Sequence, residues 1–172
     1  MARVAFILDE MFEDSEFQVP YERVKESGHT PVIVGLESGK KLTGKKGEVT
    51  ITTERAIADV SADEFDALVI PGGYSPDKIR TNSDMVELTR RIFVASKPVA
   101  AICHAGWMLA EADILRGKTV TSWPSIKTDL TNAGAEWVDQ EVVEDDNLIT
   151  SRKPDDLESF TKTLLSQIEQ RS

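Results

Sequence analysis

The sequence predicts an α/β fold built on a mostly parallel β-sheet. Short apolar runs alternate along the chain with segments whose apolar residues recur at helical spacing, which is the pattern of successive βα units. The first run, residues 4–8, is apolar throughout, as expected for a strand that helices cover on both faces. The chain has 172 residues, about the length of one domain, so we expect a single α/β domain over residues 1–172.

The first half of the chain is predicted to hold three strands, a helix and a hairpin. Residues 13–27 carry apolar side chains at mostly helical spacing, and Gly28 follows as a typical helix-ending residue. Residues 37–53 are rich in Gly, Lys and Thr and predict an excursion that contains a hairpin. The strands predicted in this half are residues 4–8, 30–36 and 67–70.

The second half repeats the alternation and ends in a helix. A helix over residues 83–96 has an inner stripe that includes Met85, Leu88 and Ile92. The last helix opens at Pro154, and acidic residues in its first turn suit the positive end of a helix. Further predictions are strand 98–102, helix 104–112, an extended segment 119–122, helix 125–133 and an antiparallel pair, 141–144 with 147–151.

Composition excludes several classes of protein. The chain has 30 acidic and 20 basic residues, a net charge of −10, whereas a nucleic-acid binder would normally be basic. No apolar stretch approaches the ~20 residues of a membrane-spanning helix. The apolar run near the N-terminus is too short for the core of a signal peptide. One cysteine and two histidines argue against a disulfide or a metal site. We therefore predict a cytoplasmic protein with no cofactor, no metal, no nucleic-acid partner and no membrane partner.

Three strand ends carry unusual residues. Residues 9–13 follow the first strand, residues 71–73 (Pro-Gly-Gly) follow the third, and residues 103–106 (Cys-His-Ala-Gly) follow the strand at 98–102. In an open α/β sheet, ligands bind beyond the carboxyl ends of the strands. If these strands are parallel neighbours, the three loops meet in one crevice.

Cys103 is the strongest candidate for a reactive group. It follows an apolar strand and opens a predicted helix, which is the strand-to-helix turn of a nucleophile elbow. The positive end of that helix would lower the pKa of the thiol. A lone cysteine is often only a small buried apolar residue, but this setting favours a reactive thiol. For the neighbouring His104, a backbone-capping role and a catalytic role both stay open.

The other candidates are weaker when each is considered alone. Gly72 and Gly73 would let backbone N–H groups approach a ligand, and with the turn at Ala105 they are candidates for oxyanion and substrate binding, although they also suit an ordinary tight turn. Glu13 lies in an acid-rich helix start, where carboxylates normally face water. Asp77 follows Ser-Pro, as a first-turn acid of a helix does.

Several separated motifs occur in an order that resembles one family. They are Ala-Ile-Cys-His-Ala-Gly at residues 101–106, Phe-Glu-Asp at 12–14, Ile-Pro-Gly-Gly at 70–73, and the segments 132–139 and 151–157. Together they resemble the PfpI family of intracellular cysteine proteases, in the superfamily of the Parkinson-disease-associated protein deglycase. The resemblance runs nearly from end to end and implies a flavodoxin-like three-layer sandwich.

The resemblance also implies roles for particular residues. It implies Cys103 as the nucleophile and Glu13 as the acid that hydrogen-bonds the cysteine and moves a proton. It implies that His104 pairs with an acid of a neighbouring subunit, here Asp77, and hence a homodimer or higher homo-oligomer. The family often has glutamate at that position, and it commonly reads Cys-His-Gly-Pro where this chain has Ala105 and Gly106. Trp107 and Trp123 are candidates for lining the pocket, although the default interpretation of both is an aromatic residue of the core or rim.

The function predicted first is a cofactor-free cysteine hydrolase, a stress-response deglycase or glyoxalase. Its substrates would be small aldehydes such as methylglyoxal, or their adducts on proteins. One alternative is an intracellular cysteine peptidase whose Cys103-His104-Asp77 triad is shared between subunits. Another is a non-catalytic redox sensor or holdase chaperone, because an activated thiol oxidises readily. A glutamine amidotransferase is excluded, since it needs a histidine after the elbow and none follows His104.

Overall fold

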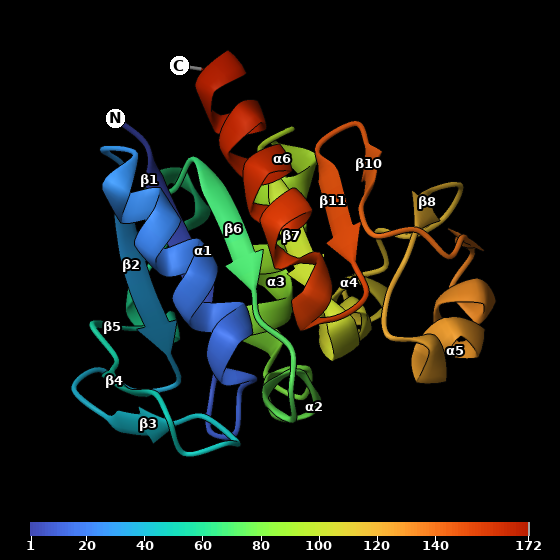
Figure 1. The fold of residues 1–172 in the computed structure, drawn as a ribbon. Helices are drawn as coiled ribbons and strands as arrows, with labels where there is room; N and C mark the ends of the chain where they lie inside the picture. The colour runs from blue at the N-terminus through green and yellow to red at the C-terminus, as the bar shows by residue number, and fades with distance from the viewer. Residues whose placement is uncertain (172) are drawn as a thin grey trace.

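A computed structural model describes residues 1–171 and shows a seven-stranded sheet with helices on both faces (Figure 1). The strand order is β10-β11-β7-β6-β1-β2-β5, and all neighbours are parallel except β10 and β11. The prediction of an α/β fold on a mostly parallel sheet is confirmed. The strands are β1 (Arg3–Ile7), β2 (Thr30–Gly35), β5 (Arg55–Ala56), β6 (Ala67–Ile70), β7 (Val99–Ile102), β10 (Val143–Asp145) and β11 (Leu148–Ser151).

Two helices cover each face of the sheet. Helices α1 and α6 lie side by side on one face, and α3 and α4 pack on the other (Figure 1). None of the helices within residues 1–171 is both long and apolar enough to span a membrane. The helices are α1 (Asp14–Glu26), α2 (Ser75–Ile79), α3 (Ser83–Val94), α4 (Gly106–Glu111), α5 (Lys127–Asn132) and α6 (Leu157–Gln170).

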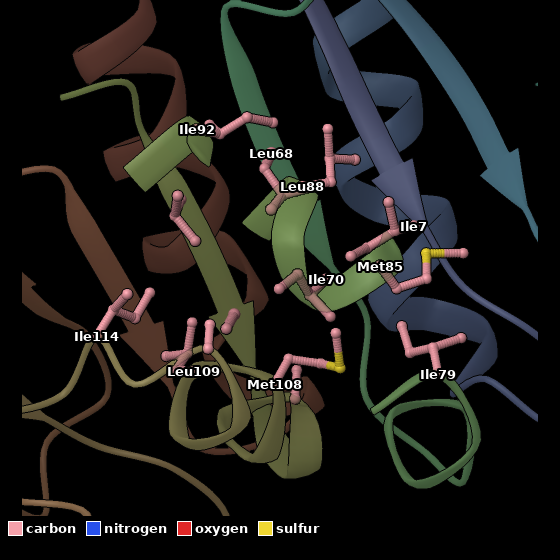
Figure 2. Packing of buried hydrophobic residues seen from close by; sticks show 14 of the residues in the cluster. Ile7, Leu68, Ile70, Ile79, Met85, Leu88, Ile92, Met108, Leu109 and Ile114 are labelled. Carbon is pink, nitrogen blue, oxygen red and sulfur yellow. The ribbon is translucent and has the colours of Figure 1, made fainter. Parts of the chain in front are cut away.

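The alternation of side chains along β1 builds two cores. Val4 and Phe6 are fully buried in the cluster beneath α1 and α6, whereas Ala5 and Ile7 are fully buried in the cluster beneath α3 and α4. Successive residues of a strand point to opposite faces, so a continuous apolar run is required when both faces are covered. Figure 2 shows the second cluster, in which the strand residues meet Met85, Leu88, Ile92, Met108 and Leu109.

Two smaller sheets flank the main one. Strands β3 (Lys41–Thr43) and β4 (Thr50–Thr52) form an antiparallel hairpin, which confirms the excursion predicted over residues 37–53. The extended segment predicted at residues 119–122 contains β8 (Thr119–Val120), which pairs with a strand that the sequence did not predict, β9 (Glu136–Trp137). Strands of two residues are too short to show a hydrophobic period, which explains this omission.

Candidate active site

The loops that follow β1, β6 and β7 meet at the carboxyl ends of these neighbouring strands. The N–H of Glu13 donates to the carbonyl of Gly72 at 3.0 Å, and the N–H of Tyr74 donates to the carbonyl of Met11 at 2.8 Å, so the first two loops are joined. Gly72 also abuts the third loop, because a Cβ built on it would lie 2.8 Å from the Cβ of Cys103. The predicted meeting of the three loops is confirmed.

Cys103 occupies a sharp turn between β7 and α4. The turn is a 3₁₀ turn over Cys103–Ala105, and Cys103 itself has a φ of 63°, in the left-handed region that costs a residue with a side chain about 1 kcal/mol or more. This is the strained strand-to-helix connection expected of a nucleophile elbow. The side chain is only 8% exposed, so the sulfur is recessed beneath the mouth of the site.

Two backbone N–H groups donate to the sulfur of Cys103. They belong to Gly73 and to His104, the residue that follows Cys103. A donor pair of this kind can stabilise negative charge on the sulfur or on an oxygen bonded next to it. The predicted donor Gly72 instead gives its N–H to Glu16, and Ala105 is fully buried in the core beneath α3 and α4.

Glu16 is the carboxyl group that lies beside Cys103, a position not predicted for it from the sequence. It is fully buried on α1, and its Oε1 accepts the Gly72 N–H at 2.8 Å. A Cβ on Gly72 would lie 2.4 Å from this oxygen, so Glu16 and Cys103 face each other across a residue without a side chain. The sequence does contain one indication that Glu16 is buried. Glu16, Pro20 and Val24 recur every four residues, which places them together on the buried side of α1.

Glu13, predicted to hydrogen-bond the cysteine, has other partners. Its carboxylate lies 2.9 Å from the Nζ of Lys45 and 3.1 Å from the Nζ of Lys46, both on the β3–β4 hairpin. Glu13 precedes the first turn of α1, whereas Glu16 lies within that turn and packs against the Gly72 loop. The place expected for Glu13 beside the thiol is therefore taken by Glu16, three residues later.

His104 lies at the side of the thiol. Its Nδ1 is 3.3 Å from the Sγ of Cys103, and its Nε2 is 3.3 Å from the Oγ of Ser125. The rings of Trp107 and Trp123 flank the imidazole at 5.1 Å and 6.4 Å between centroids, in keeping with the pocket-lining position considered for both. Burial, followed by the charge of Lys45, lowers the pKa of His104, so the ring is neutral at neutral pH.

Asp77 lies on α2, outside this cluster. It is exposed and borders a surface groove together with Arg80 and Glu87. Within one chain the Nε2 atom of His104 contacts Ser125, which is where a third member of a triad would bind. The predicted pairing of His104 with Asp77 of another subunit therefore stays a prediction.

Burial has the largest effect on the pKa of the Cys103 thiol. Burial and then the charge of Glu16 raise the pKa of the thiol to about 12, whereas the two N–H groups and the Lys45 ammonium act to lower the pKa. The prediction that the helix end lowers the thiol pKa is wrong for the resting site. Helix α4 has only six residues, so its dipole is outweighed by the loss of hydration around the sulfur.

Burial also has the largest effect on the pKa of Glu16. It raises the pKa of this carboxyl group from 4.5 to about 8, and the charge of Glu13 acts in the same direction against the hydrogen bond from Gly72. At neutral pH the group is mainly a carboxylic acid. The resting site thus holds two protons, one on the thiol and one on Glu16.

The raised pKa of Glu16 predicts a pH-dependent stability. The unfolded chain loses this proton near pH 4.5 and the folded protein near pH 8, so the free energy of unfolding falls as pH rises between these values. Glu16→Gln removes the titration, and the stability of the wild type relative to this variant should fall by on the order of 3 kcal/mol from pH 5 to pH 8. Urea unfolding at several pH values measures the difference. The exposed Glu26→Gln is the control, and an identical pH slope in both variants would refute the assignment.

Comparison with known proteins assigns the chain to a family. The family described as DJ-1/PfpI matches residues 2–167, and Cys103, at the elbow, lies within that match. The chain belongs to the DJ-1/PfpI family. "Protein/nucleic acid deglycase 2" of Escherichia coli is 44% identical over 164 residues, which are 95% of this chain and 95% of that protein. "General stress protein 18" of Bacillus subtilis is 42% identical over 97% of this chain and 98% of that protein.

A solved structure agrees with this membership of the DJ-1/PfpI family. A two-domain protein from Anabaena variabilis, with DJ-1/ThiJ/PfpI-like and ferritin-like domains, superimposes with a TM-score of 0.97 and 40% identity. The match covers 98% of this chain and 48% of that protein, so this chain spans about half its length. The predicted family, its fold and the predicted class of enzyme, a cysteine-dependent hydrolase, are confirmed.

Proposed function

We propose that this cysteine hydrolase acts on reactive α-oxoaldehydes such as methylglyoxal, and on their adducts with proteins. The observation that carries the proposal is the buried carboxyl group of Glu16 facing Cys103 across Gly72, with a pKa of about 8. A group whose pKa lies near the working pH can both take up and release a proton during a reaction. The names of relatives, a deglycase and a general stress protein, support the same substrate class.

The first step is addition of the thiol to the aldehyde. The sulfur bonds to the aldehyde carbon, the C=O double bond becomes a single bond, and the thiol proton ends on the oxygen to give a hemithioacetal. The N–H groups of Gly73 and His104 lie at the sulfur and can stabilise the charge that develops on that oxygen. Bond formation to carbon thus replaces prior ionisation of a thiol whose pKa is raised.

The second step moves a proton between two carbons. The carboxylate form of Glu16, which becomes populated as pH approaches about 8, removes the proton from the former aldehyde carbon and delivers it to the neighbouring keto carbon. The hydroxyl proton passes from the former aldehyde oxygen to the former keto oxygen, so that the first becomes a carbonyl and the second a hydroxyl group. The product is a thioester of Cys103 with a 2-hydroxy acid. Water then cleaves the thioester, which releases lactate from methylglyoxal and restores the thiol. The sum is addition of one water, with no external oxidant or reductant.

A peptidase activity is the second candidate. The 3.3 Å approach of His104 Nδ1 to the sulfur favours it, because a thiol–imidazole pair can cleave amide bonds. The pair would need a carboxylate on the far side of the imidazole to accept its N–H, and the proposed acceptor is Asp77 of a second copy in a homodimer or larger oligomer. This activity would therefore depend on assembly, whereas the chemistry of Glu16 would not.

His104→Ala separates the two candidates. Lactate formation from methylglyoxal should fall by less than about tenfold, because the backbone N–H of residue 104 remains, whereas loss of a general base costs 10²–10⁴. Cleavage of a fluorogenic peptide, if present, should disappear. Ser125→Ala serves as the matched control, since it removes only the second contact of the imidazole. The absence of lactate from the wild type would reject the aldehyde substrate, and a large loss in His104→Ala would reject the role given to Glu16.

A further inference from the structure

Two lysines at the start of the turn between β3 and β4 stand beside the active site. The Nζ atoms of Lys45 and Lys46 lie 2.9 Å and 3.1 Å from the carboxylate of Glu13, and Lys45 also lies 5.7 Å from the centre of the Tyr74 ring. Tyr74 directly follows Gly73, whose N–H donates to the sulfur. The lysine side chains therefore reach the loops after β1 and β6, which meet the Cys103 turn, and they have no role in the aldehyde mechanism above.

A buried carboxylate holds this hairpin in place. Asp14 is 1% exposed and accepts hydrogen bonds from the backbone N–H groups of Lys46, Glu48 and Val49, at 2.9, 3.0 and 2.9 Å. The N–H of Lys45 donates to the carbonyl of Phe12 at 2.8 Å. The backbone that carries the two lysines is thus fixed by hydrogen bonds on both sides of the turn.

The charges at the mouth are arranged with the cations outward. The Glu13 side chain is 5% exposed, whereas Lys45 and Lys46 are 34% and 55% exposed, so solvent meets the ammonium groups and not the carboxylate. At the mouth two cations contact one anion, Glu13, whereas the second carboxylate of this region, Asp14, is buried beneath the turn and bound by three backbone N–H groups. Glu16 is mainly uncharged at neutral pH. The negative charge of Glu48, on the same hairpin, offsets part of the charge of Lys46. Lys45 is therefore the main positive charge that acts on Cys103. This local positive charge contrasts with the net charge of −10.

We propose that Lys45, assisted by Lys46, determines substrate specificity by binding a carboxylate on the carbonyl compound that reacts with Cys103. Glu13 already shows that these two ammonium groups clasp a carboxylate, and their exposed sides are free to face a second one. The preferred substrates are then α-oxoaldehydes or carbonyl adducts that carry a carboxylate. The inference rests on Cys103 as the reacting group and goes beyond the proposed function by naming the charge of the substrate.

Alkylation of Cys103 by iodoacetate and by iodoacetamide tests this without any turnover. The same thiolate attacks both reagents and displaces the same leaving group, iodide, so the ratio of the two rate constants cancels the thiol pKa and reports the local potential. We expect the ratio in the wild type to exceed that of a small free thiol by roughly 3- to 10-fold, as one charge a few ångströms away would give in a partly aqueous site. The excess should shrink as salt is added.

Lys45→Gln should lower the ratio by roughly 3- to 10-fold, and Lys46→Gln by less. Lys41→Gln is the matched control, because it makes the same change of charge at an exposed position on β3 of the same hairpin, and its ratio should equal that of the wild type. A wild-type ratio equal to that of the free thiol, or equal losses in Lys45→Gln and Lys41→Gln, would overturn the inference alone. Failure of iodoacetamide to alkylate Cys103 at all would overturn both the inference and the proposed function.

Discussion

Replacing Cys103 with serine is expected to lower lactate formation from methylglyoxal by at least about 1,000-fold, a loss typical of removing a nucleophile. A hydroxyl group is a much weaker nucleophile than a thiol, and burial raises even the pKa of the thiol to about 12. The substitution preserves shape, so the left-handed backbone at residue 103 and its two N–H donors should remain. Lactate measured at saturating methylglyoxal gives the loss.

The control for this prediction is the folded state of the variant. Cys103 is small and nearly isosteric with serine, so the urea midpoint of Cys103→Ser should stay close to that of the wild type. A variant that is folded and retains more than a few per cent of the turnover would remove Cys103 from the mechanism. The reaction would then require another group at the mouth.

Replacing Glu16 with glutamine should lower the same turnover by roughly 10²- to 10⁴-fold, the range for loss of a general acid–base. Glutamine can still accept the N–H of Gly72 through its carbonyl oxygen, but it cannot take a proton from the substrate carbon. Glu13→Gln is the matched variant, three residues earlier on the same chain segment. We expect it to cost less than about tenfold, because the Glu13 carboxylate contacts Lys45 and Lys46.

The order of these two effects decides between the glutamates. If Glu13→Gln is the more damaging substitution, the proton transfer belongs to Glu13, as the family resemblance implied. If both variants retain full turnover, neither Glu13 nor Glu16 carries out the proton transfer. Alkylation of Cys103 by iodoacetamide in each variant shows separately whether the thiol itself is still reachable.

The longer strands and the meeting of three loops at their ends could be predicted because each strand has a clear local pattern in the sequence. Residues 4–8 are apolar on both faces, which requires a strand beneath two helical layers, and β1 indeed feeds two cores. The turn at Cys103 was recognisable because small residues follow an apolar strand directly. Two-residue strands such as β9 leave no such pattern, since their pairing depends on contacts distant in sequence.

By itself, the sequence determined the fold class and the position of Cys103 at a strand end, because apolar periodicity and a strand-end cysteine are local properties. The family was indicated by several separated motifs that resemble it. Only the tertiary structure decided which glutamate of the α1 segment faces the thiol and in which direction the pKa of each group moves. Glu13 and Glu16 are less than one helical turn apart, so spacing alone cannot tell which of them packs against Gly72. A pKa depends on the water and charge around a group, and both are set by segments brought together in folding.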